Sequence, residues 1–210
     1  FDHARKLSYQ AIFDRAEGRR GSYAYRLNPD GLTEQNTYAI THGFDWNQAL
    51  SRNAILDLNA RHSHYHYTDW AYKDVFDLRY DAAGPAQSDP SYELGAIIQG
   101  VDVNRFEVRA NTLQVKSTGT SQVTGQHLVK VGGELFLPRI EFGVPGWIIV
   151  AGSRGLVRHL DDPPDYPALI QYRPIITDAF VQDQIEWEDL TLRGGLRLDY
   201  FDARSYVPGD

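Results

Sequence analysis

Three histidines alternate along one stretch of the sequence and could together hold a metal ion. His62, His64 and His66 occupy every second position, so a β-strand would place the three imidazoles on one face. Neutral imidazole is a good ligand for transition metals, and two neighbouring rings could share an ion. The outer pair, however, would stand about 13 Å apart along a strand. We therefore predict no metal site, and we expect the row to lie where a strand leaves a membrane.

Other residues that could do chemistry give weaker signals. The carboxylates of Asp161 and Asp162 could bind calcium, but the run Asp-Asp-Pro-Pro-Asp is more typical of a rigid acidic bend. Ser, His and Asp are plentiful, yet the sequence has no nucleophile elbow, phosphate-binding loop or HExxH zinc helix. The absence of cysteine excludes thiol chemistry and Cys-type zinc sites. The sequence thus predicts no enzyme, no catalytic residue and no cofactor.

The charge balance and the apolar runs narrow the class of protein. The 210 residues include 21 Lys and Arg against 28 Asp and Glu, a formal net charge of -7. The sequence has no basic stripe that could replace the counterions on nucleic-acid phosphates, so we expect no nucleic-acid partner. No apolar run approaches the roughly 20 residues of a membrane helix. The 13 Tyr, 4 Trp and 18 Gly are nonetheless a composition that a membrane β-barrel would show.

The elements that must position these residues are β-strands. Apolar and polar residues alternate with period two, which is typical of a strand with two unlike faces. We count about seven such strands, and many run past ten residues, longer than the typical soluble strand of about 5 or 6. The alternation is clearest in segments 7–13, 38–46, 56–60, 106–110, 129–137, 179–187 and 192–200.

The connections between these strands alternate in length. Short turns are expected near 50–53, 123–126 and 188–189, and long connections over 17–35, 68–103 and 143–171. Tight periplasmic turns at one end and long extracellular loops at the other are what a transmembrane barrel produces. We therefore predict an all-β fold, an antiparallel up-and-down transmembrane β-barrel segment of about seven long strands that forms an incomplete barrel. A soluble β-sandwich, whose strands also alternate, is the alternative fold.

Two positions interrupt the alternation. Leu113 and Val115 change face relative to Val108 and Ala110, and a β-bulge near residues 111 and 112 would explain the change. Asp183 falls on the lipid side, where a charge costs up to a few kcal/mol near the midplane. A bulge or a position near the periplasmic interface would resolve this second conflict, and the sequence leaves both open.

The C-terminal part contains phrases that resemble the barrel of TonB-dependent outer-membrane receptors. An aromatic-Val-Gln-Asp phrase at 180–183 precedes a tight turn and a Gly-Leu-Arg-Leu-Asp-Tyr strand at 195–200. The upstream segments 121–124 and 127–134 and the turn at 28–31 fit the same pattern. The resemblance covers most of the chain and is sharpest between residues 117 and 202.

The resemblance implies a plugged barrel of about 22 strands in the bacterial outer membrane. Such receptors import scarce nutrients, namely metal chelates, cobalamin or oligosaccharides, with energy from the TonB complex. The sequence contains no plug domain, TonB box or signal segment, so we expect 1–210 to be a barrel fragment. Its expected partners are outer-membrane lipid, the missing plug domain and remaining strands, the TonB complex and a small-molecule nutrient.

Two groups of residues are candidate binding residues. Aromatic loops can stack on sugars or chelates, and the candidates there are Tyr23, Tyr25, Arg26, Trp70, Tyr72, Trp147 and Tyr166. The second group should face the lumen and contact a plug or a passing solute; it comprises Lys130, Glu134, Glu186, Arg193, Arg197 and Asp199. A hydrated wall of mutual salt bridges is the alternative for this second group. A soluble ligand-binding module and a non-transporting structural or adhesin barrel remain the alternative functions.

Overall fold

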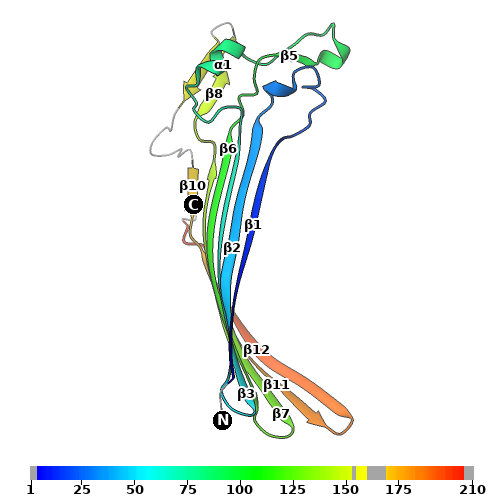
Figure 1. The fold of residues 1–210 in the computed structure, drawn as a ribbon, viewed down its shortest axis with the longest axis vertical. Helices are drawn as coiled ribbons and strands as arrows, with labels where there is room; N and C mark the ends of the chain where they lie inside the picture. Colours follow the sequence, from blue (N-terminus) through cyan, green and yellow to red (C-terminus); the bar gives the residue numbers. More distant parts are fainter. Residues whose placement is uncertain (1–3, 153–154, 160–168, 206–210) are drawn as a thin grey trace, which may run out of the picture.

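The computed structural model describes residues 4–152, 155–159 and 169–205 and consists mainly of one long antiparallel sheet (Figure 1). Seven long strands pair in chain order, so the predicted all-β up-and-down arrangement is confirmed. The long strands are β1 (Arg5–Arg19), β2 (Glu34–Ala49), β3 (Ala54–Trp70), β6 (Phe106–Gln122), β7 (His127–Gly143), β11 (Ile175–Trp187) and β12 (Leu190–Asp202). The sheet does not close on itself, because β1 and β12 each pair with only one neighbour among the described strands. It is therefore an incomplete barrel.

The connections between these strands confirm the alternation of short and long. The short turns lie at 50–53, 123–126 and 188–189, and the long loops separate β1 from β2, β3 from β6, and β7 from β11. Each of the first two turns closes with a backbone hydrogen bond, from Leu50 to Ala54 (2.9 Å) and from Val123 to His127 (2.9 Å). The last turn places Glu188 at a φ of 32°, in the left-handed region that tight hairpin turns require.

The long loops contain the remaining elements and gather at one end of the sheet (Figure 1). These elements are η1 (Pro29–Gly31), α1 (Leu78–Ala83), β4 (Gln87–Ser88), η2 (Glu93–Gly95), β5 (Ile97–Gln99), β8 (Trp147–Val150) and β9 (Leu156–His159). We call this assembly of loops the cap. Its interior is a small apolar core of Val75, Tyr80, Val101 and Ile148. Among the described residues, no helix has the length and apolar character needed to cross a membrane.

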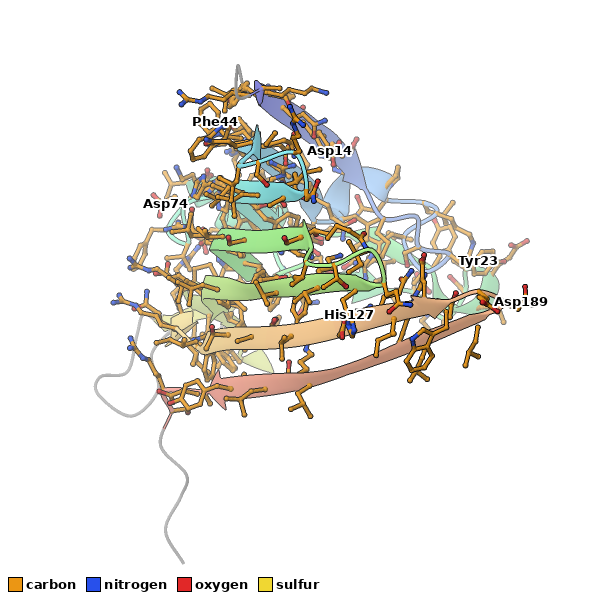
Figure 2. The ribbon with its side chains drawn as sticks, turned by 90° about the horizontal axis from the view of Figure 1, so that it is seen from below. Asp14, Tyr23, Phe44, Asp74, His127 and Asp189 are labelled. Carbon is orange, nitrogen blue, oxygen red and sulfur yellow. The ribbon has the colours of Figure 1, made fainter. Side chains whose placement is uncertain are left out.

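Each long strand has two faces, which the register of the sheet assigns. Residues directly opposite each other on antiparallel strands share a face, so Leu196 defines an outer face and Arg197 an inner face. Leu192, Leu196 and Leu198 are 52%, 79% and 74% exposed, and Figure 2 shows side chains standing off both faces of a single curved layer. A β-sandwich would bury such leucines beneath a second sheet. The described chain contains no such sheet, so the sandwich alternative is wrong.

The outer face is apolar over a band that matches the thickness of a membrane. On β7 the outer residues are apolar or glycine over 129–137, and Arg139 and Glu141 follow on the same face. On β2 the outer residues over 38–46 are aromatic or aliphatic except for His42. A strand crosses the hydrocarbon with about 9 to 11 residues. Because β2 has 16 residues and β7 has 17, both strands extend beyond the membrane at the end that carries the cap.

The apolar band crosses the strands obliquely. One row of paired residues runs from Leu198 on β12 through the sheet to Leu58, Trp46 and Leu7. On β12 the band lies on the short-turn side of this row, over 190–198, whereas on β1 it lies on the long-loop side, over 7–13. A membrane has a flat surface, so the strands must be tilted relative to its normal, as they are in barrels.

The predicted bulge in β6 is wrong. Asn111 and Thr112 pair in unbroken register with β3 on one side and with β7 on the other. Leu113 therefore belongs to the outer face and Ala110 to the inner face of one regular strand. The change of face at Leu113 and Val115 instead marks the level at which the two faces exchange polarity. The outer face leaves the hydrocarbon at this level.

A short strand, β10 (Leu169–Tyr172), continues the line of β11 beyond an interruption at residues 173 and 174. Both strands pair with β7 in the same register, which would place Pro138 opposite Pro174. Proline has no backbone N–H to donate to a sheet. The two prolines thus explain why the pairing lapses at this level and resumes beyond it.

Candidate functional site

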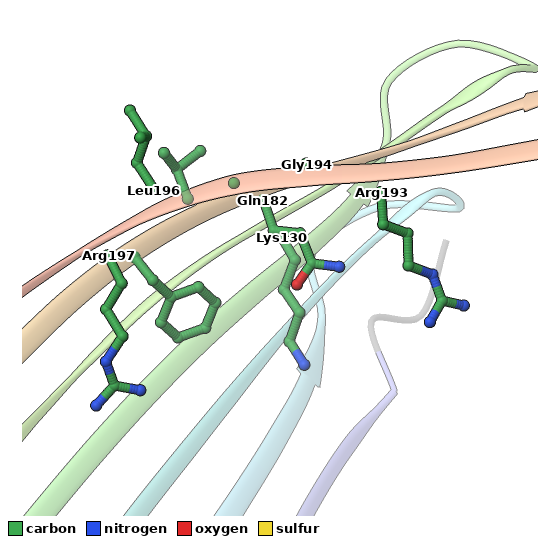
Figure 3. A pocket seen from close by; sticks show the side chains of 9 residues that line it. Lys130, Gln182, Arg193, Gly194, Leu196 and Arg197 are labelled. Atoms are coloured by element: carbon green, nitrogen blue, oxygen red, sulfur yellow. The ribbon is translucent and has the colours of Figure 1, made fainter.

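The predicted lumen residues lie together on the inner face of β7, β11 and β12. Lys130, Gln182, Arg193 and Arg197 line a pocket of about 630 Å³ over these strands. Figure 3 shows these four side chains on one side of the sheet and Leu196 on the other. Period-two alternation therefore placed these side chains on one common face.

Ion pairs neutralise part of this inner wall. Arg197 donates from Nη2 to Asp178 Oδ2 (3.0 Å) and from Nε to Asp199 Oδ1 (2.8 Å). Arg193 instead donates from Nε to the neutral amide oxygen of Gln184 (2.7 Å). Lys130 has no hydrogen-bond or ion-pair partner in the described part of the chain. Salt bridges within the wall thus account for Arg197 and Asp199, and they leave Lys130 and Arg193 without a carboxylate.

The two predicted glutamates are held by amides on neighbouring inner positions. Glu134 Oε1 accepts a hydrogen bond from Gln114 Nε2 (2.6 Å), and Glu186 Oε1 accepts one from Gln184 Nε2 (2.6 Å). All six predicted lumen residues share the inner face. Amide partners fix the direction of both carboxylates without neutralising them.

A second polar ladder lies on the inner face of β2 and β3, and sequence reasoning missed it. Arg61 Nη2 donates to both carboxylate oxygens of Asp45 at 2.7 Å, and Asn59 Nδ2 donates to the same residue at 2.6 Å. Further along, Asn47 Nδ2 donates to Asp57 Oδ1 (2.5 Å). Polar residues at every second position were the signal, but pairing across strands needs the register. The inner face is therefore polar in both halves of the sheet, on β2 and β3 as well as on β7, β11 and β12, at the level of the outer apolar band.

The candidate residues of the first long loop divide into exposed and buried. Tyr23 is 63% exposed, and the guanidinium of Arg26 lies 4.0 Å from the centre of its ring. Arg26 also donates to the backbone oxygen of Glu93, which fixes its position against the second loop. Tyr25 is only 8% exposed, and burial, aided by the charge of Asp102, raises the pKa of its phenol. Tyr23 is open to solvent, Arg26 is partly buried beside it, and Tyr25 packs the cap.

The aromatic candidates of the later loops have similarly mixed positions. Tyr72 is half-buried, with the ring of Tyr80 at 4.9 Å and the guanidinium of Arg79 at 4.0 Å. Trp70 lies beneath Arg105 (5.0 Å), and Trp147 is 56% exposed at the start of β8. Tyr166 lies outside the described residues, as do Asp161 and Asp162. Trp147 is thus the most accessible of the described candidates in these two loops.

The first two loops are bound to each other by backbone and amide contacts. Asn28 Nδ2 donates to the backbone oxygen of Gly100 (2.8 Å), and the backbone nitrogen of Asp102 donates to Gly31 (2.7 Å). A Cβ added at Gly31 would stand 2.5 Å from the oxygen of Gly100, so only glycine permits this approach. The cap therefore holds its exposed aromatic residues on a packed support.

The histidine row lies on the outer face of β3, on the cap side of the apolar residues at 56–60 and beside residues 38–42 of β2. Each imidazole has its own partner on a neighbouring strand: His62 Nδ1 lies 3.2 Å from Nε2 of His42, His64 Nδ1 lies 2.8 Å from Asn111, and His66 Nε2 lies 2.8 Å from Glu107. The described residues contain no group of three or more side chains positioned to hold a metal. The row is part of the polar rim of the wall.

Asp183 stays on the outer face, with no bulge in the register of β11. Its Oδ2 lies 2.7 Å from Nδ1 of His127, the first residue of β7 after a short turn. The bulge that would have turned Asp183 inward is therefore absent from the described strand. Instead, the carboxylate pairs with His127 on the adjacent strand.

The comparison with protein families agrees with this architecture. The model of the family described as TonB dependent receptor-like, beta-barrel matches residues 1–210. Searches of curated proteins and of solved structures returned no significant match. The family match spans the whole chain, and the open sheet with an apolar outer band and a polar inner wall is what such a barrel requires. The chain therefore belongs to the TonB-dependent receptor-like β-barrel family, whose members are bacterial outer-membrane receptors that act in transport.

Proposed function

We propose that residues 1–210 form a wall-and-loop portion of an importer that uses TonB-supplied energy to take up a scarce nutrient. Metal chelates, cobalamin and oligosaccharides are the candidate nutrients. The observation that carries the proposal is the opposition of the two faces: leucines exposed outward over the band and Lys130 and Arg193 left without a carboxylate inside. A water-filled or plugged interior gives a reason for such charges, because lipid would not tolerate them.

The proposal includes the remainder of the barrel and a plug domain as partners of this chain. The outward edges of β1 and β12 have no neighbour in the described sheet, and unpaired strand edges are not stable in hydrocarbon. Further strands of the same barrel would pair with both edges. A plug inside the closed barrel would face the inner residues of β7, β11 and β12.

Uptake by cells that contain or lack the receptor tests the proposal. We expect deletion of the whole receptor gene to abolish growth on one limiting nutrient among ferric chelates, cobalamin and oligosaccharides. Deletion of TonB should abolish growth on the same nutrient, and a plasmid copy of the receptor should restore it only in cells that have TonB. A receptor that inserts into the outer membrane but supports no TonB-dependent uptake would instead be a structural or adhesin barrel.

A further inference from the structure

The inner face changes from polar to aromatic at the end of the wall that carries the cap. Below this level many inner positions carry charged residues or amides, as at Lys130 and Arg61, and Phe136 and Phe180 lie among them. Above it, inner positions of β3, β6, β7 and β10 form what we call the aromatic patch: Tyr65, Tyr67, Phe106, Ile140, Phe142 and Tyr172. The exchange occurs on strands with no break in register, so the patch faces the same interior as the polar wall.

The aromatic patch is accessible and its rings are ordered against each other. Phe142 and Tyr172 stack with ring centres 5.8 Å apart and planes 16° apart, and Tyr67 and Phe106 lie 6.4 Å apart. Phe106 is 39% exposed and Tyr172 is 37% exposed. Aromatic side chains that keep this much free surface on a rigid sheet offer flat apolar faces to a ligand.

Hydrogen-bonding groups adjoin the patch on the same inner face. Gln35 Nε2 donates to the hydroxyl of Tyr67 (2.8 Å) and to Oδ2 of Asp69 (3.0 Å). The Tyr67 hydroxyl in turn donates to the same carboxylate oxygen (3.1 Å). The other oxygen, Oδ1 of Asp69, is buried and has no hydrogen-bond partner in the described residues. The Tyr67 hydroxyl and the side-chain oxygen of Gln35 remain as acceptors for a hydroxylated ligand that lies against Tyr67.

The charge around the patch differs from that of the wall below. Inner positions of β2, β3, β6, β7 and β10 at this level include Asp69 but no Lys or Arg. Arg20, which directly follows β1, interacts with Tyr67 beside Asp69, so the positive charge at this level lies next to a carboxylate. An anionic chelate resting on Phe142 and Tyr172 would find no positive side chain on these strands. A neutral ring compound needs no positive partner, because its C–H face packs on the aromatic side chains and its hydroxyls bond to the amide and the phenol.

We propose that the aromatic patch, with Gln35 and Asp69, is a binding surface for a neutral oligosaccharide. The proposal rests on the importer function proposed above and selects one of its nutrient classes. A sugar ring stacks on Phe142 and Tyr172, and a neighbouring ring places its hydroxyls at Tyr67 and Gln35. The ligand would enter past the cap, whose loops lie at this end of the sheet (Figure 1).

Calorimetric titration of the full-length receptor in detergent tests this surface, with maltohexaose, cellohexaose and mannohexaose as neutral probes and ferric citrate as the anionic one. We expect one neutral probe to bind and ferric citrate not to bind. Phe142→Ala and Tyr172→Ala should each weaken the binding by about tenfold or more, because each removes a stacking face. Tyr67→Phe keeps the ring and should weaken it less. Phe76→Ala, which removes an exposed aromatic ring of the cap outside the patch, is the matched control and should leave the affinity unchanged.

Several results would overturn the assignment of the patch. These are no binding of any neutral probe to the wild-type receptor, affinity that is unchanged in Phe142→Ala, or a patch variant that releases the plug while its barrel stays folded. TonB-dependent uptake of a chelate or of cobalamin in place of a sugar would also contradict the oligosaccharide proposal, while leaving the importer function intact. Loss of all TonB-dependent uptake would refute the importer function itself, so the two failures are distinguishable.

Discussion

The guanidinium of Arg105 donates a hydrogen bond from Nε to the backbone oxygen of Pro145 over 2.8 Å. This contact joins the second long loop to the third. The same side chain, 6% exposed, donates to the backbone oxygens of Tyr72 and Lys73, both at 2.6 Å, and to the hydroxyl of Tyr80 at 3.1 Å. One buried cation thus satisfies several carbonyl groups of the cap.

Arg105→Ala should loosen the cap while the sheet remains folded. Hydrogen bonds to a charged group contribute about 1.5 to 3 kcal/mol each, and their buried acceptors would lose their partner. We expect the cap to become about 3 kcal/mol less stable towards local opening. Limited proteolysis of the full-length receptor should show faster cleavage within 71–105. Lys73→Ala, which removes an exposed cation of the same loop and keeps the backbone oxygen that Arg105 contacts, is the control, and equal cleavage of the two variants would contradict the role of Arg105.

Val115→Arg should impair insertion of the receptor into the membrane, whereas Gln114→Arg should not. The two positions are sequence neighbours on opposite faces of β6, so they differ in environment but hardly in depth. Arginine on the lipid face costs about 2 to 4 kcal/mol near the midplane, whereas at position 114 it would face Glu134. Heat-modifiable migration of outer-membrane extracts measures the folded fraction. Similar folded fractions for the two variants would refute the assignment of the faces.

The pair of His127 and Asp183 should show strong coupling. Removal of either side chain leaves the other polar group on the outer face without its partner, at a cost of about 1 to 3 kcal/mol. The double variant His127→Leu with Asp183→Leu should be close to the wild type, because well-packed apolar residues often replace such a pair without loss. Unfolding of the wild type, the two single variants and the double variant by guanidinium chloride in detergent gives the coupling energy. Strictly additive losses would show that the two residues act independently.

The carboxyl group of Asp77, at the start of α1, should titrate far below its usual range. Hydrogen bonds from the side chain and then from the backbone of Arg79 lower its pKa from 3.8 to about 2. Because the folded pKa is depressed, the contribution of Asp77 to the stability of the loop is complete above pH 3.8 and is lost as the pH falls through about 2.

NMR titration of the carboxyl carbon of Asp77 checks this value. Arg79→Ala should return the midpoint of Asp77 towards 3.8. The pKa of Asp89, lowered chiefly by a hydrogen bond from Ser91, should not move in that variant and serves as the internal control. An unchanged midpoint for Asp77 would exclude Arg79 as the cause.

The strands and the rhythm of their connections could be predicted because a barrel wall repeats one local rule. Each strand must present lipid-compatible residues at every second position, and this requirement is visible in the sequence without any knowledge of pairing. The predicted lumen residues, such as Lys130 and Arg197, followed from the same rule and lie on one face. Their partners did not follow from it, because the ion pair between Arg197 and Asp178 needs the register of two strands.

The cap and the aromatic patch could not be predicted, for two different reasons. The cap depends on contacts between distant segments, such as Asn28 with Gly100, and the burial of Tyr25 is a product of that packing. The patch was hidden because alternation assigns a residue to a face but not to a height. The change at Leu113 therefore suggested a bulge, although it marks the level at which the strand leaves the hydrocarbon.

The oblique course of the apolar band from β1 to β12 has a geometric consequence for the rest of the receptor. Each hairpin is staggered relative to the previous one in the same direction. A row of paired residues followed across the sheet therefore shifts steadily along the membrane normal. When the barrel closes, the total stagger is its shear, which together with the number of strands fixes the barrel radius. This portion of the wall thus already sets the direction of stagger that the further hairpins must keep for the first and last strands to pair.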